Sequence, residues 1–323
     1  MRKISIIGSG HVGATCAFDI AQRELADVVL LDILEGIPQG KALDMMEAFP
    51  LKGFNGKVVG TNNYADIRDS TLVIVAAGFA RQPGMSRLDL LEKNAQIVKS
   101  VTGNIVKFAP ESMILIVTNP LDIMTYLAFM ESGFERNRVF GMSGLLDAAR
   151  FSHFIALELG ISVEDVSAMV LGAHGDSMVP LSRFSTVSGI PITELLSSKV
   201  IKGIIERTRK GGAEIVSYLK TGSAFYAPAT AVVEMVESIL KDRKRILPVC
   251  SYLDGEYDLK DVCVSVPVKL GENGIEGIIE LKLTSAEKKA LHASAATVKE
   301  GIKNLRLIIH HEPKQNSAET ISS

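Results

Sequence analysis

The sequence predicts an α/β fold in which a doubly wound parallel sheet is followed by a mixed α+β domain. In the first half of the 323-residue chain, short β-branched runs alternate with amphipathic helical stretches. This alternation is typical of a parallel sheet covered by helices on both faces. A Gly-rich turn joins the first run to the first helical stretch, and near Gly144 the alternation gives way to longer helices and strands. We therefore expect a first domain over residues 1–143 and a second over 144–312.

The first domain is expected to contain six short strands that are apolar on both faces. These strands are Lys3–Ile7, Val28–Asp32, Val58–Thr61, Leu72–Ala76, Met113–Val117 and Arg138–Phe140. The amphipathic stretches between them include Val12–Gln22, Ile37–Ala48 and Leu88–Phe108.

The second domain is expected to begin with a helix and to end with a long amphipathic one. The elements between residues 144 and 281 are a helix (Leu145–Leu159), a strand (Val166–Leu171), a hairpin-like region through Val187, two helices (Ile201–Leu219 and Ala229–Leu240) and three strands (Ile246–Leu253, Val262–Leu270 and Ile275–Leu281). Thr284 and Glu287 form a capping-box pattern that opens the last helix. The apolar stripe of that helix consists of Leu291, Ala295, Val298, Ile302, Leu305 and Ile309. Residues 313–323 are expected to form a flexible tail.

Composition excludes several classes of protein. The formal net charge of −2 gives no bulk attraction for nucleic acid or anionic membrane. The basic run Lys241–Arg245 lacks interleaved aromatic residues, so a solvated connection is favoured over a nucleic-acid patch. The apolar stretch Ser112–Met130 has a polar, charged interruption in its middle, which argues against a membrane span. Cys16, Cys250 and Cys263 show no disulfide or zinc spacing, so we expect a soluble cytoplasmic protein without a metal.

The Gly-rich turn has the pattern GxGxxG, which suits a dinucleotide. Its residues are Gly8, Ser9, Gly10, His11, Val12 and Gly13. Glycines here permit a tight turn and a close approach of backbone N–H groups to a pyrophosphate, although a plain Gly-rich turn has the same pattern. Asp32 ends the second expected strand, where a carboxylate can accept hydrogen bonds from a ribose 2′-hydroxyl and repel a 2′-phosphate. The pattern therefore favours NAD over NADP, and a turn residue is the alternative for Asp32.

A candidate acid/base group follows an apolar strand in the second domain. His174 lies in the polar turn Gly172–Asp176, and a single histidine is more often structural than catalytic. Asp147 and Arg150 are three residues apart on one expected helix, so both can point into the same cleft. A surface ion pair between them is the alternative.

Two more segments lie where the strands of a parallel sheet end. Arg81 and Arg87 flank a segment with Gln, Pro and Gly after the fourth strand, as expected of a mobile lid over an anionic ligand or of an ordinary loop. Asn119 follows the fifth strand, and the carboxyl ends of strands border the ligand crevice in open α/β sheets.

Taken together, five motifs in order resemble the lactate/malate dehydrogenase family. They are Gly8–Gly13 with Asp32, Arg81–Arg87, Val117–Pro120, Leu146–Arg150 and Gly172–Asp176. The resemblance extends from Lys3 to about Ile309, shows no departure at the catalytic positions, and is greatest to the malate-specific branch with a lactate dehydrogenase-like architecture. It implies a Rossmann NAD-binding domain, a catalytic domain and a homo-oligomer, with a tetramer favoured over a dimer. A slightly high apolar share of the composition agrees with surfaces hidden between subunits.

The resemblance also implies a role for each residue of the motifs. His174 would be the acid/base group and Asp147 its orienting carboxylate. Arg150 would bind the substrate carboxylate and Arg87 the reacting carbonyl. Asn119 would bind the substrate. Together with Val117 and Thr118 it would also bind the cofactor. Asn94 lies seven residues after Arg87 on the same expected helix and would face the cofactor as well.

The implied activity is reversible oxidation of (S)-malate to oxaloacetate with NAD, a reaction of the tricarboxylic acid cycle. A lactate dehydrogenase, or a dehydrogenase of another 2-hydroxy acid, is the alternative within this class. Lactate dehydrogenases have Gln six residues before the loop arginine, where this chain has Arg81, a cation that suits a second carboxylate. Selectivity through Gly222–Ala224 is the alternative explanation. A non-catalytic dinucleotide sensor is disfavoured because His174, Asp147 and Arg150 are all present.

Overall fold

The chain folds around one large sheet that continues from its first half into its second. The structure is a computed structural model and describes residues 2–79 and 86–310. Within these ranges the sheet has nine strands in the order β14-β13-β12-β6-β5-β4-β1-β2-β3. Its parallel part consists of β1 (Lys3–Ile7), β2 (Asp27–Leu31), β3 (Val58–Thr61), β4 (Leu72–Val75), β5 (Met113–Ile116) and β6 (Val139–Gly141). Its antiparallel part consists of β12 (Arg245–Asp254), β13 (Lys260–Gly271) and β14 (Gly274–Ile278).

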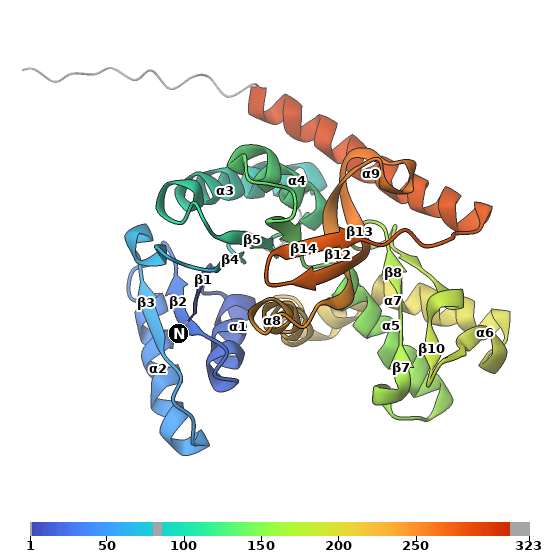
Figure 1. Cartoon of the computed structure of the whole chain (residues 1–323), viewed down its shortest axis with the longest axis horizontal. Coiled ribbons are helices and arrows are strands. Elements are labelled where there is room, and N and C mark those ends of the chain that lie inside the picture. The colour runs from blue at the N-terminus through green and yellow to red at the C-terminus, as the bar shows by residue number, and fades with distance from the viewer. Residues whose placement is uncertain (1, 80–85, 311–323) are drawn as a thin grey trace, which may run out of the picture.

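Both faces of the parallel part are buried, because alternate residues of each strand enter different cores. In β4, Leu72 and Ile74 belong to one apolar cluster, and Val73 and Val75 belong to another on the opposite face. The first face is covered by α1 (His11–Gln22) and α8 (Tyr226–Leu240), and the second by α3 (Arg87–Phe108) and α4 (Leu121–Ser132) (Figure 1). The long α9 (Ser285–His310) packs against α3, α4 and β13. This is the predicted α/β, Rossmann-like arrangement.

The remaining elements complete the two halves of the chain. The helices are α2 (Ile37–Lys52), α5 (Gly144–Leu159), α6 (Ile192–Leu195) and α7 (Ser198–Leu219). The short helical turns are η1 (Tyr64–Ile67), η2 (Val163–Asp165), η3 (Ser182–Phe184) and η4 (Glu256–Asp258). Two small sheets contain β7 (Val166–Ser167), β10 (Thr186–Val187) and β11 (Ile190–Pro191), and β8 (Val170–Leu171) and β9 (Val179–Pro180).

The structure corrects one predicted element and contains others that were not predicted, among them α4, α6 and β11. The segment Val166–Leu171, expected to be one strand, is two strands, β7 and β8, which belong to different small sheets. Between them the backbone N–H of Met169 donates to the side-chain hydroxyl of Ser185 and not to a neighbouring strand. The chain thus leaves one sheet before it enters the other. The helix α4 was not predicted, since it is apolar almost all round and shows no helical period. The capping box of α9 is confirmed: Thr284 and Glu287 exchange hydrogen bonds of 2.7 and 3.2 Å.

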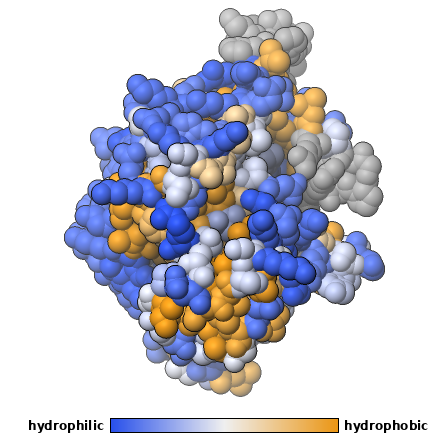
Figure 2. All heavy atoms as spheres, turned by 90° about the vertical axis from the view of Figure 1, so that its right-hand side faces the viewer, coloured by the Kyte–Doolittle hydropathy of each residue, from blue (hydrophilic) through white to orange (hydrophobic). Residues whose placement is uncertain are grey.

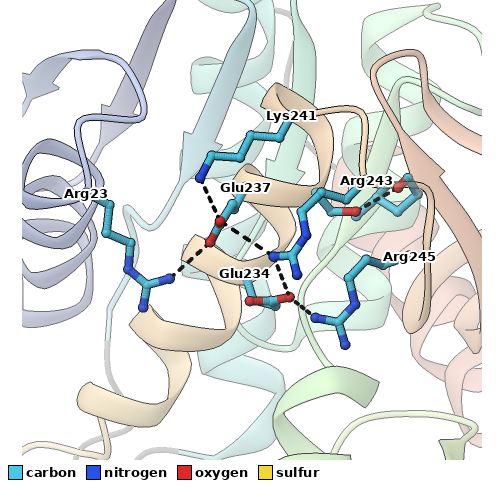
Figure 3. A network of polar contacts seen from close by, with 8 residues as sticks. Arg23, Glu234, Glu237, Lys241, Arg243 and Arg245 are labelled. Carbon is cyan, nitrogen blue, oxygen red and sulfur yellow. Dashed lines mark hydrogen bonds and ion pairs between the residues drawn. The ribbon is translucent and has the colours of Figure 1, made fainter.

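The predicted connection Lys241–Arg245 is held by ion pairs at the end of α8. Glu237 lies 2.9 Å from Lys241 and 3.2 Å from Arg23 of α1. Arg243 lies 3.5 Å from both Glu234 and Glu237, and Arg245 also pairs with Glu234 (Figure 3). Carboxylates of the preceding helix therefore meet these cations, which agrees with a structural connection.

Apolar segments and cysteines lie in the folded core. Within residues 2–79 and 86–310, no helix is both long and apolar enough to cross a membrane. Cys16, Cys250 and Cys263 are free thiols and all three are buried.

Candidate active site

The Gly-rich turn brings β1 and α1 into close contact and leaves one side open. Gly8 has φ +103°, and a Cβ there would lie 2.5 Å from the backbone nitrogen of Ala77. A Cβ on Gly13 would lie 1.9 Å from the carbonyl oxygen of Gly8, so neither position accepts a side chain. A Cβ on Gly10, by contrast, would meet no described atom within 4 Å. The first backbone N–H groups of α1 thus border an open space, which fits the pyrophosphate of a dinucleotide.

Asp32 follows β2 and lies beside this turn. Its carboxylate accepts hydrogen bonds from the backbone N–H of Ser9 at 2.6 Å, the hydroxyl of Ser9 at 2.8 Å and the N–H of Leu34 at 3.1 Å. Partial burial raises the pKa of Asp32, but these hydrogen bonds outweigh it and lower the pKa below its usual value. Lys41 of α2, which sequence reasoning missed, donates to the carbonyl of Ser9 at 2.5 Å. An ionised carboxylate therefore stands at the predicted ribose position.

The ends of β4 and β5 are tied together by buried polar side chains. The hydroxyl of Thr118 donates to the carbonyl of Ala77 at 2.6 Å. Asn94 of α3 is fully buried; its amide donates to the carbonyl of Asn119 at 2.6 Å and accepts from the N–H of Phe79 at 2.8 Å. The amide thus fixes the backbone that carries Asn119, and its contact with a cofactor stays a prediction.

The two loop arginines are placed only in part. Arg87 is the first residue of α3, which begins with a capping box between Ser86 and Asp89. The side chain of Arg87 and all of Arg81 lie outside the described residues.

His174, Asp147 and Arg150 come together as the sequence predicts. The Nδ1 atom of His174 lies 2.9 Å from Oδ2 of Asp147, and Nη1 of Arg150 lies 3.5 Å from Oδ1 of the same carboxylate. Asp147 is buried, whereas 21% of the His174 side chain is exposed. Burial lowers the pKa of His174, but the nearby Asp147 carboxylate outweighs it and raises the pKa above its usual value. Asp147 therefore orients the imidazole and stabilises its charged form.

A second carboxylate, which sequence reasoning missed, lies behind the histidine. Asp122, in the first turn of α4, accepts a hydrogen bond of 2.8 Å from the backbone N–H of His174. Among the described residues its Oδ1 atom has no hydrogen-bond partner. Burial raises the pKa of Asp122 to about 6, against the lowering effect of this hydrogen bond. The sequence signal that could have pointed to Asp122 is its position three residues after Asn119, in the segment that follows the central strand β5.

His174 faces a cavity of about 810 Å³. Asn119, Asp122 and His174 line it on one side, and Thr297, Glu300 and Asn304 of α9 line it on another. The contribution of α9 was not predicted, because only the fold brings it to this place. Arg150 is not among the described lining residues; it lies against α7 instead.

Comparison with known proteins identifies the family to which the two halves of the chain belong. Residues 2–141 match the model of the lactate/malate dehydrogenase NAD-binding domain, and residues 145–306 match that of the lactate/malate dehydrogenase alpha/beta C-terminal domain. The chain belongs to the lactate/malate dehydrogenase family. As a member of this family it is an NAD-dependent oxidoreductase, and the predicted cofactor is confirmed.

Its relatives include malate and lactate dehydrogenases. The chain is 57% identical to a malate dehydrogenase of Nostoc, over 94% of each chain. It superposes on the apo malate dehydrogenase of Picrophilus torridus with a TM-score of 0.93 and 45% identity, over 97% of this chain and 99% of that one. The lactate dehydrogenase of Cryptosporidium parvum, complexed with lactic acid and NAD, gives a TM-score of 0.91 and 42% identity over 94% and 98%.

Proposed function

We propose that the protein catalyses the reversible, NAD-dependent oxidation of (S)-malate to oxaloacetate. The observation that carries this proposal is the pairing of His174 with Asp147 at 2.9 Å, beside a cavity bordered by the end of β5. The high identity to malate dehydrogenases supports the choice of substrate.

In this proposal His174 moves the proton. Asp147 holds Nδ1, so Nε2 is the nitrogen that accepts the hydroxyl proton of the alcohol and returns it in the reverse direction. The carboxylate of Asp147 then stabilises the imidazolium that forms. When bound, the nicotinamide accepts or supplies the hydride at substrate C2.

The remaining predicted residues would bind substrate and cofactor. Arg150 binds the carboxylate next to the reacting carbon, and Arg87 and Asn119 bind the reacting oxygen. The turn Gly8–Gly13 holds the pyrophosphate and Asp32 the ribose. The residues Asn94, Val117, Thr118 and Asn119 form the nicotinamide end of the site.

Lactate dehydrogenase activity is the second candidate, because lactate dehydrogenases are also close structural relatives. We favour malate because Arg81 stands where lactate dehydrogenases have Gln, and a second carboxylate can pair with this cation. Pyruvate would leave the guanidinium enclosed without a partner, which costs on the order of 2–5 kcal/mol.

We also propose that the chain acts as a cytoplasmic homo-oligomer, with a tetramer favoured over a dimer. Apolar side chains gather on the lower half of the face shown in Figure 2, where β7, β10 and the end of α5 lie. Exposed apolar residues of this region are Leu157, Ile161, Val163 and Ile190. A surface of this kind is typical of a contact between subunits.

The proposed acid/base role is tested by His174→Asn. We expect kcat for malate oxidation to fall by at least about 100-fold, because the proton acceptor is removed. NADH binding, followed by fluorescence titration, should stay unchanged, since the Gly-rich turn is a separate part of the site. The matched control is His153→Asn, an exposed histidine of α5. A near-normal rate for His174→Asn would place the base elsewhere.

A further inference from the structure

The helix α7 contains three glycines in its interior, although glycine weakens a helix relative to alanine. At Gly203 a Cβ would meet no atom of the described chain within 4 Å, so nothing in the structure requires glycine there. At Gly211 a Cβ would lie 3.3 Å from Cδ and 3.7 Å from Nε of Arg150. At Gly212 it would lie 3.8 Å from both terminal nitrogens of the same guanidinium. Two of the glycines thus meet one functional side chain.

The backbone of α7 therefore lies along the whole Arg150 head group, from Cδ to Nη1 and Nη2. On the side of α5, Asp147 Oδ1 lies 3.5 Å from Nη1. The Nε atom is buried and has no hydrogen-bond partner among the residues described, and only 14% of the side chain is exposed. Arg150 is thus confined between a carboxylate and bare helix backbone, and several of its donors remain available to a ligand.

We propose that Gly211 and Gly212 are positioning residues that set the plane of the Arg150 guanidinium for a carboxylate-bearing substrate. This inference rests on the proposed role of Arg150. A bidentate pair needs the carboxylate and the guanidinium in one plane, with both N–H···O bonds short. A methyl group at residue 211 would displace Cδ by a few tenths of an ångström. A methyl group at residue 212 would lie against the terminal nitrogens that bind the carboxylate.

The test compares Gly211→Ala and Gly212→Ala with Gly203→Ala, which is the matched control on the same helix. For Gly211→Ala we expect KM for oxaloacetate to rise about tenfold, because the added Cβ displaces Cδ of Arg150 and a misplaced binding group loses substrate affinity. For Gly212→Ala we expect a similar rise for a different reason, because the added methyl group occupies space beside Nη1 and Nη2, where the carboxylate would bind. The dissociation constant of NADH, measured by fluorescence, should stay within about twofold of wild type. Gly203→Ala should raise Tm without changing KM. A merely structural role would make all three variants alike, with KM unchanged, and would overturn the inference.

A double-mutant cycle shows whether the glycines act through Arg150. Lysine lacks the planar fork, so Gly211→Ala should have little further effect on KM in an Arg150→Lys background. An undiminished tenfold effect in that background would overturn the inference while leaving the role of Arg150 intact. If Arg150→Lys itself left KM unchanged, the proposed role of Arg150 would fail, and the inference with it. Should Gly211→Ala not fold, Gly212→Ala carries the same test, since its Cβ lies at an ordinary contact distance.

Discussion

Two carboxylates act on His174 from different parts of the chain. Asp147 of α5 pairs with the ring, and Asp122 of α4 accepts the backbone N–H. Both favour the imidazolium, whereas burial and the cation of Arg150 disfavour it. The buried thiol of Cys250 is a further neighbour of Asp122. The pKa of His174 is therefore set by residues from both halves of the chain. Asp122 also fixes the position of the His174 backbone.

The effect of Asp122 on proton transfer is tested by Asp122→Asn. Asparagine keeps an oxygen that can accept the His174 N–H but removes the negative charge, so the pKa of His174 should fall. Oxidation needs the neutral imidazole, and kcat/KM for malate therefore rises with pH through this pKa. We expect the rising limb of the pH profile to move to lower pH in the variant.

The matched control for this shift is Glu131→Gln, an exposed carboxylate near the end of α4, which should leave the profile in place. If the rising limb of the pH profile is unchanged or moves to higher pH in Asp122→Asn, then Asp122 exerts no such charge effect on His174.

The sequence predicts those residues of the candidate site that occur in recognisable motifs, but not those that only the fold brings near. His174, Asp147 and Arg150 were found because their spacing and turn context carry information. Asp122 and Lys41 were missed because each contacts its partner through a hydrogen bond to the backbone, which leaves no pattern in the sequence.

At the level of elements, the strands of the parallel sheet were predicted to within one residue at each end. Their β-branched runs are short and bounded by polar residues, which makes them distinct. The helix α4 was missed because an almost fully apolar helix lacks the 3.6-residue period. The boundary between domains at residues 143 and 144 stays a prediction, and β12 pairs directly with β6 across it.

The free energy of unfolding should depend on pH through Glu287, a carboxylate at the N-terminus of α9. Hydrogen bonds from Arg183 and from Thr284 lower the pKa of Glu287 to about 2. Because this pKa is depressed, the contribution of Glu287 is complete above its unfolded-state pKa of about 4.3 and is lost as pH falls towards 2. Glu287→Gln should therefore lower the free energy of unfolding by about 1–2 kcal/mol at pH 7.

Urea unfolding at several pH values measures this difference, which should shrink below about pH 4 and be lost as pH falls through about 2. The exposed Glu194→Gln serves as the control and should change stability little at any pH. A difference that persists unchanged at pH 2 would show that the charge of Glu287 is not its source.

For the whole molecule, the apolar face in Figure 2 predicts assembly. Sedimentation equilibrium should give a mass near four chains, and Leu157→Lys should shift it to smaller species by placing a charge in the contact. Met130→Lys changes an exposed apolar residue of α4 and is the control. A wild-type mass near one chain at assay concentration would contradict the proposed oligomer.

We propose that this member of the family acts on a dicarboxylate. The most direct measurement is the oxidation of NADH with oxaloacetate and with pyruvate, assayed side by side on the same preparation. We expect kcat/KM for oxaloacetate to exceed that for pyruvate by roughly 30-fold or more, since only oxaloacetate supplies a carboxylate partner for Arg81. Equal values, or a preference for pyruvate, would contradict the assignment of malate as the substrate.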